Sequence, residues 1–83
     1  MKLLLRNIDR TITEAQLLEL FQVYGTVQYC TIVMDEKTGQ SKGFGFVELP
    51  NAGHAKSAMK NLNGYLLGDS KMRVKKAEDK KAN

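Results

Sequence analysis

One eight-residue stretch limits the possible folds of this chain more than any other part. Residues 42–49, KGFGFVEL, have the composition of a β-strand and stop at Pro50. Alternate side chains of a strand point to opposite faces, so one face carries two charged and two aromatic side chains, Lys42, Phe44, Phe46 and Glu48. Burying both charges without partners would be costly, so we predict that this face lies in water and that its phenylalanines do too.

The opposite face of the same stretch is predicted to be buried. It carries Gly43, Gly45, Val47 and Leu49, and the two glycines would let a helix approach the strand closely. An alternative is that the two phenylalanines belong to the core of a strand whose charges lie at its ends. The first interpretation predicts a sheet with one open face and one covered face.

Three further segments are predicted to be strands. Residues 2–8 form the first, and residues 27–34, which are rich in β-branched and aromatic side chains, form the second. Residues 71–76 alternate between charged and apolar side chains and form the last. Residues 35–41, DEKTGQS, are polar and contain a glycine, so they predict a hairpin loop longer than a tight turn.

Two amphipathic segments are predicted to be helices. Thr13 precedes the first at the spacing of a capping box, and Gly25 follows it as a stop signal. The second opens at Asn51 or Gly53 and ends at the Asn63-Gly64 pair.

The order β-α-β-β-α-β predicts an α+β fold of the ferredoxin-like type. Right-handed connections place both helices on one face of a four-stranded antiparallel sheet and leave the other face open. A chain of 83 residues is long enough for one domain. We place that domain at residues 1–77 and a flexible charged tail at residues 78–83.

The same alternation assigns side chains of the other strands to the open face. Lys2, Leu4 and Arg6 point outward, whereas Leu3, Leu5 and Ile8 point inward. In the last strand Lys71, Arg73 and Lys75 point outward. The second strand is ambiguous because Gln28 shares its parity with Cys30 and Ile32. Packing against the helices favours those two inside, which leaves Tyr29, Thr31 and Val33 outside.

The basic excess of the chain is concentrated near its end. Thirteen basic and nine acidic residues give a net charge of +4, and all of this excess falls within residues 71–83. Such a segment attracts polyanions, or alternatively acts as a solubilising tail.

The predicted open face therefore combines flat rings with cations. Rings stack on bases and cations contact phosphates, which is the combination that binds single-stranded nucleic acid. The side chains expected to bind are Phe44, Phe46, Leu4, Lys42, Lys2, Arg6, Tyr29, Arg73 and Lys75.

Two of these segments match known sequence motifs. KGFGFVEL resembles the octamer of the RNA recognition motif (RRM) family, [K/R]-G-[F/Y]-[G/A]-F-V-x-[F/Y], at seven of eight positions. The exception is Leu49, which faces inward. Residues 3–8, LLLRNI, resemble the hexamer of the same family, and the resemblance extends from residue 1 to about residue 77.

The resemblance implies a role for each matching position. Phe46 would stack on one base, Phe44 would pack against a sugar and Lys42 would contact a phosphate. Leu4 stands where the family usually has a second stacking ring, so we expect weaker or shifted binding, with Tyr29 as partial compensation. The cations of the last strand would contact the RNA backbone and base edges: Arg73, Lys75 and Lys76.

Several other classes of function have no support in the sequence. The longest apolar run, residues 3–5, is too short for a membrane span or a signal peptide. Cys30 and His54 are each the only residue of their type, which argues against a disulfide, a metal site and a catalytic centre. We expect a cytoplasmic, monomeric, non-enzymatic protein without cofactor, metal, membrane or small-molecule substrate.

Two alternatives stay open at this point. Because Leu4 lacks the usual ring, the fold could instead serve as a protein-interaction module that uses its helical face. Single-stranded DNA is also a candidate ligand, because no residue visibly reads a 2′-hydroxyl group. The resemblance to small one-domain members leads us to expect a free-standing protein.

Overall fold

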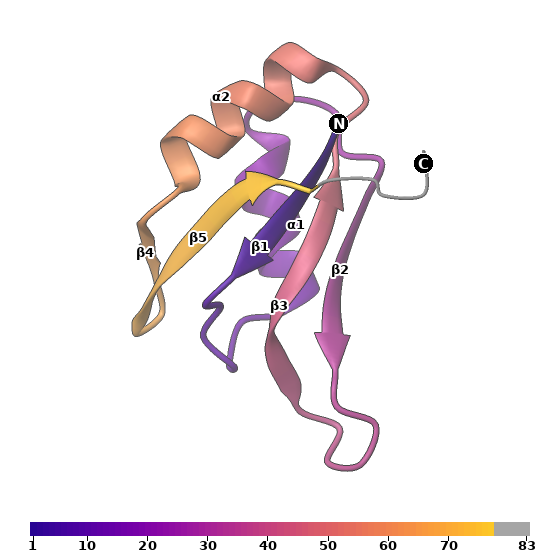
Figure 1. The fold of residues 1–83 in the computed structure, drawn as a ribbon, viewed down its shortest axis with the longest axis vertical. Coiled ribbons are helices and arrows are strands. Elements are labelled where there is room, and N and C mark those ends of the chain that lie inside the picture. Colours follow the sequence, from indigo (N-terminus) through magenta and orange to yellow (C-terminus); the bar gives the residue numbers. More distant parts are fainter. Residues whose placement is uncertain (78–83) are drawn as a thin grey trace.

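A mixed set of seven elements forms the part of the chain that the computed structural model describes, residues 1–77 (Figure 1). In chain order they are β1 (Lys2–Arg6), α1 (Glu14–Gln22), β2 (Tyr29–Met34), β3 (Ser41–Glu48), α2 (Ala52–Leu62), β4 (Tyr65–Leu67) and β5 (Ser70–Lys76). The strands form one antiparallel sheet in the order β2-β3-β1-β5-β4. The predicted α+β, ferredoxin-like arrangement is confirmed, and the expected tail at residues 78–83 lies outside the described residues.

The sheet has five strands, so the prediction of four was wrong. The additional strand, β4, pairs with β5 from Tyr65 opposite Met72 to Leu67 opposite Ser70, across a turn in which Gly68 has a φ of 67°. Three residues are too few to show an alternating pattern, which explains why the sequence did not reveal this strand. The predicted strand at residues 71–76 is β5.

Both helices begin where local hydrogen bonding predicts. In α1, Thr13 and Gln16 form a reciprocal capping box, because each side chain accepts a hydrogen bond from the backbone N–H of the other. In α2, the Asn51 side chain accepts a hydrogen bond from the backbone N–H of His54, so Asn51 and not Gly53 opens the helix. No helix in the described part of the chain is long and apolar enough to cross a membrane.

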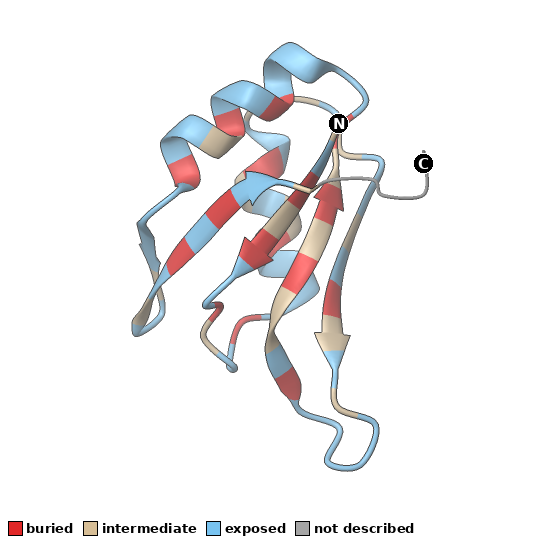
Figure 2. Cartoon of the chain, viewed as in Figure 1, coloured by how far each residue is buried: buried red, intermediate tan, exposed pale blue. Residues whose placement is uncertain are grey.

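The core lies between the sheet and the two helices, which cover the same face (Figure 1). Leu17 and Phe21 from α1 and Ala55, Ala58 and Leu62 from α2 pack against the inward side chains of the strands. Figure 2 shows the resulting alternation of buried and exposed residues along β5. The opposite face of the sheet is left without a covering layer among residues 1–77.

The predicted orientation of β3 is confirmed. Val47 is completely buried against the helices, whereas Phe44 and Phe46 are partly exposed. The alternative with both phenylalanines in the core is therefore wrong. In β2, Ile32 is buried and Tyr29 is exposed, as helix packing suggested.

The glycines of β3 have a different role from the one predicted. A Cβ atom on Gly45 would collide with the Thr31 carbonyl oxygen of the neighbouring strand β2. Gly43 has a φ of 83°, a conformation that L side chains rarely adopt, and lies close to the Ile8 carbonyl. Gly45 therefore allows a close approach of β2 to β3, and Gly43 a close approach of the loop after β1, so neither contact is between a strand and a helix.

Candidate nucleic-acid interface

The centre of the open face is a row of side chains that runs across four strands. Leu4 of β1 lies directly opposite Phe46 of β3 on one side and Lys75 of β5 on the other, and Phe46 lies opposite Thr31 of β2. Directly opposite residues of antiparallel strands present their side chains on the same face. The row therefore joins one apolar contact and one aromatic ring to a flanking cation.

A second row lies one step along the sheet and adds a ring and a cation. Lys2 is opposite Glu48, which is opposite Tyr29. The Lys2 ammonium nitrogen is 4.6 Å from the centroid of the Phe46 ring, a cation–π contact that holds positive charge beside the ring. Glu48 accepts a hydrogen bond of 2.9 Å from the amino group of Met1. The structure thus brings the predicted Lys2 and Tyr29 next to the stacking surface.

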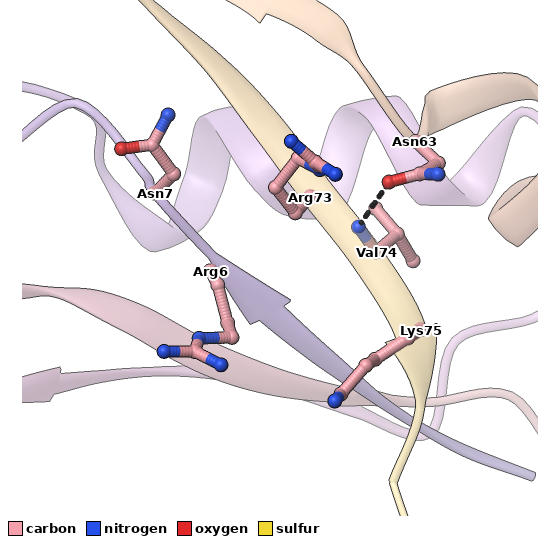
Figure 3. A pocket seen from close by; sticks show the side chains of 6 residues that line it. All are labelled: Arg6, Asn7, Asn63, Arg73, Val74 and Lys75. Carbon is pink, nitrogen blue, oxygen red and sulfur yellow. Dashed lines mark hydrogen bonds between the residues drawn. The ribbon is translucent and has the colours of Figure 1, made fainter.

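Three cations meet on the β1–β5 side of the face. Arg6 lies directly opposite Arg73, and both line a hollow together with Lys75 (Figure 3). Like charges directly opposite each other destabilise a sheet, by a few tenths to about 1 kcal/mol. Among residues 1–77 the single ion pair joins Met1 and Glu48, so no described carboxylate neutralises this cluster. A bound anion would neutralise the charge of these three cations.

Two asparagines complete this hollow. The Asn7 side-chain amide donates to the Lys71 carbonyl at 2.8 Å. The Asn63 side-chain carbonyl accepts from the Val74 N–H at 3.1 Å (Figure 3). Each amide thus has one end anchored to β5 and another end with no partner in the described part of the chain. The Asn63-Gly64 pair was predicted only to end a helix, so the place of Asn63 beside the hollow comes from the tertiary structure.

The other end of the open face contains a cation that sequence reasoning missed. Arg10, on the loop between β1 and α1, lines a hollow together with Lys42 and Phe44. The alternation of side chains places only strand residues on a face of the sheet. Arg10 lies in a loop, so this alternation could not predict its position. The predicted Lys42 and Phe44 are located together at this end, on the first half of β3.

The single cysteine lies away from this surface and is chemically quiet. Burial, together with the charge of Glu14, raises the pKa of Cys30 to about 11, so its thiol stays protonated at neutral pH. Its Sγ atom is 3.9 Å from the Glu14 carbonyl on the helix side of β2. The structure therefore agrees with a packing role for Cys30.

The open face of this antiparallel sheet carries partly exposed rings between cations that form no ion pair among residues 1–77. This combination is typical of domains that bind single-stranded nucleic acid. The family model described as "RNA recognition motif" matches residues 3–73. The chain belongs to the RNA recognition motif family, as its octamer and hexamer suggested.

Curated relatives are similar over most of this chain but are much longer. Polyadenylate-binding protein 6 of Arabidopsis thaliana is 44% identical over 72 residues, which cover 87% of this chain and 13% of the relative. The chloroplastic RNA-binding protein CP29B of the same organism is 35% identical over 74 residues, which cover 89% of this chain and 26% of the relative. The chain thus corresponds to a fraction of these proteins.

Solved structures with the same fold include one that contains RNA. The crystal structure of RNA Binding Protein PG1 has a TM-score of 0.90 and 32% identity, with 96% of each chain covered. The structure of the Rna15 RRM with bound RNA (GU) has a TM-score of 0.84 and 33% identity, and it covers 94% of this chain and 83% of that one.

Proposed function

We propose that this chain binds single-stranded RNA on the open face of its sheet and acts by binding alone, without catalysis. The observation that carries this proposal is the placement of Phe44 and Phe46 on that face beside cations that have no carboxylate partner among residues 1–77. Membership of a family named for RNA recognition, and the RNA in the Rna15 structure, support the same ligand.

The stacking surface is displaced toward β2 and β3. Phe46 stacks on one base and Phe44 contacts a sugar, the roles that the family resemblance implies. Tyr29 lies on the edge strand β2, two residues from Thr31, which is opposite Phe46. Its side chain is 42% exposed and offers a second ring at that edge of the sheet. Leu4 provides apolar contact on β1 without a ring, so the RNA loses one base-stacking position there, worth about 1–3 kcal/mol.

The proposal is tested by substituting rings of equal exposure on opposite faces. Phe46→Ala and Tyr29→Ala are expected to weaken binding of a short single-stranded RNA, the former by about 1–3 kcal/mol. The matched control is Tyr65→Ala, because Tyr65 is also 42% exposed but pairs with the inward-facing Met72. Binding is measured by fluorescence anisotropy, and amide shifts in NMR titrations should concentrate on β1, β3, β5 and the Tyr29 end of β2.

Equal affinity for the parent chain and Phe46→Ala would remove the sheet platform as the binding site. A protein partner that is retained after nuclease treatment and after loss of both phenylalanines would favour the protein-interaction alternative. Among the large exposed hydrophobic residues in the described part of the chain, Val23 lies at the end of α1, and the others, Tyr29, Met34, Tyr65 and Leu66, belong to strands.

The remaining expectations extend this proposal to the intact protein. We propose a monomer, to be checked by light scattering, and a cytoplasmic location, to be checked by imaging of the tagged protein. Preference for RNA over single-stranded DNA is tested with matched oligonucleotides that differ only in the 2′-hydroxyl group. The domain boundary at residue 77 is likewise a proposal.

A further inference from the structure

We propose that the RNA backbone follows a groove around the end of β1, and that Arg10 contacts a phosphate in the middle of this groove. The inference rests on the proposed RNA binding but adds a route for the backbone and a contact residue outside the strands. It would extend the site beyond the stacking surface toward the loop between β2 and β3.

Three adjoining hollows form the groove. The first lies over β5 and contains Arg6, Arg73 and Lys75 (Figure 3). The second shares Arg6 with the first and adds Arg10, and the third shares Arg10 with the second and reaches the β2–β3 loop. Because neighbouring hollows share residues, they lie side by side from β5 to that loop, and we take them together as the groove.

The walls of the groove are strongly basic. Five cations line it: Arg6, Arg10, Lys42, Arg73 and Lys75. The carboxylates on its walls are Asp9 and Asp35, so the cations exceed the acids by three. Among residues 1–77 none of these cations forms an ion pair. A chain of phosphodiesters, with one negative charge at each step, complements such a surface.

Both carboxylates of the groove are already engaged by the protein. Asp9 accepts hydrogen bonds from the N–H and hydroxyl of Thr11 at 2.9 and 2.8 Å and from the Asp69 N–H at 2.7 Å. Asp35 accepts from the Lys37 and Thr38 N–H groups at 2.8 and 3.3 Å. These donors hold the carboxylates in local turns, and neither carboxylate forms an ion pair with a groove cation among residues 1–77. The hydrogen bonds to Asp35 lower its pKa and the charges of Lys42 and Arg10 lower it further, so Asp35 offsets part of their charge.

Arg10 projects from a loop that is fastened at several points. Ile8 donates its N–H to the Gly43 carbonyl at 2.9 Å, and the Asn7 side chain bonds to β5. Ile8 and Ile12, which flank Arg10 two residues away on each side, are buried in the core. The backbone of Arg10 is therefore held in place before RNA arrives, which lowers the entropic cost of the contact.

The chemistry of Arg10 and its neighbours favours a phosphate of a nucleic acid. A guanidinium group presents planar paired donors that match two phosphate oxygens. Phe44 lines the second and third hollows together with Arg10 and Lys42, so a sugar or base on that ring brings its phosphate between the two cations. An anion without a sugar or base would leave the ring without a partner.

The test compares Arg10→Gln with a matched loss of charge elsewhere. The control is Lys60→Gln, an exposed cation in the last turn of α2 that lies outside all three hollows. Affinities for a long single-stranded RNA, and for one of about three nucleotides that fills only the stacking surface, are measured over a range of salt concentrations. Thermal unfolding checks that both variants are folded.

We expect Arg10→Gln to weaken binding of the long RNA about threefold to tenfold at low salt. Its plot of log affinity against log salt should become shallower by about 0.7, the loss of one phosphate contact on a single strand. The three-nucleotide RNA should bind Lys60→Gln like the parent chain, and Arg10→Gln should weaken its binding by no more than the one phosphate contact beside Phe44. Arg10→Lys, which keeps the charge but not the paired donors, should lie between the parent and Arg10→Gln.

Two outcomes would overturn the inference in different ways. If Arg10→Gln matches Lys60→Gln in affinity and salt slope while Phe46→Ala still weakens binding, the groove is wrong and the RNA-binding proposal stands. If Phe46→Ala has no effect either, the RNA-binding proposal itself fails, and the groove fails with it.

Discussion

At the scale of single residues, Leu4 is the position that separates this chain from the family pattern. It lies between Phe46 and Lys75 in the central row of the open face and is partly exposed. A ring at this position would extend the aromatic surface from β3 onto β1. We therefore propose that the leucine limits the extent of base stacking on β1.

We expect Leu4→Phe to increase RNA affinity by about 1–3 kcal/mol, because the new ring supplies the missing stacking position. Isothermal titration calorimetry with a short single-stranded RNA measures this change. Leu4→Met, which conserves volume without adding a ring, serves as the control. An affinity of Leu4→Phe equal to that of the control would show that RNA does not cross β1 at this level.

Asp9 is the residue that holds the Arg10 loop, and its ionisation makes that role testable. Hydrogen bonds from the backbone N–H groups of Thr11 and Asp69, and from the Thr11 hydroxyl, lower the pKa of Asp9 from its ordinary value of 3.8. A lowered pKa in the folded state means that the carboxylate stabilises the fold above the unfolded value. That contribution is lost as the pH falls through the folded pKa.

We therefore expect the stability of the parent chain to decrease more than that of Asp9→Asn between about pH 5 and about pH 2.5. Urea denaturation at a series of pH values gives the two curves, and an NMR titration of the Asp9 carboxyl carbon gives the folded pKa. Parallel curves for the two proteins would show that Asp9 does not couple this loop to folding.

At the scale of secondary-structure elements, the contact between β2 and β3 depends on a missing side chain. The backbone of Thr31 occupies the space that a Cβ atom of Gly45 would need. The same two strands carry Tyr29 and Phe46, so their spacing determines how the two rings lie relative to each other. A packing constraint on one face of the sheet thus controls the binding surface on the other.

We expect Gly45→Ala to destabilise the fold by about 1–3 kcal/mol, because the added methyl group has to push β2 away from β3. Urea denaturation gives the stability, and amide shifts should change most at Thr31 and Ile32. RNA affinity should decrease even at temperatures where the variant is folded. An unchanged urea midpoint with unchanged shifts in β2 would contradict this account of the strand contact.

The net charge of the chain is carried by a strand and not by the terminal segment. Within residues 71–83, Lys71, Arg73, Lys75 and Lys76 precede residue 78, and the charges of residues 78–83 cancel. These four cations lie on β5, which pairs with β1 beside the stacking surface. The attraction for polyanions that the sequence located near the end of the chain therefore belongs to the sheet.

At the scale of the whole molecule, this distribution predicts the effect of truncation. A chain that ends at Ala77 keeps the net charge of +4 and all five groove cations. We expect its RNA affinity and salt dependence to equal those of the full chain, because both arise from phosphate contacts within the fold. Anisotropy measurements on both chains, with solubility recorded in parallel, provide the comparison. Weaker binding by the shorter chain would move part of the site beyond residue 77.

The sequence by itself determined the type and order of most elements and the face on which the side chains of β1, β3 and β5 lie. Those properties are local, because a strand alternates with a period of two and a capping box spans four residues. Parity, together with the cost of burying Lys42 and Glu48, placed Phe44 and Phe46 on the open face and Val47 in the core. The structure confirms this orientation, with both phenylalanines partly exposed and Val47 buried.

Only the tertiary structure decided which side chains meet across the sheet. The opposition of Arg6 and Arg73, the place of Arg10 beside Lys42, and the short strand β4 depend on strand register and loop closure. Register is set by contacts between segments that are far apart in the chain, such as the bond from Asn7 to the Lys71 carbonyl. A local pattern cannot contain such contacts, so the stacking surface was predictable and the groove was not.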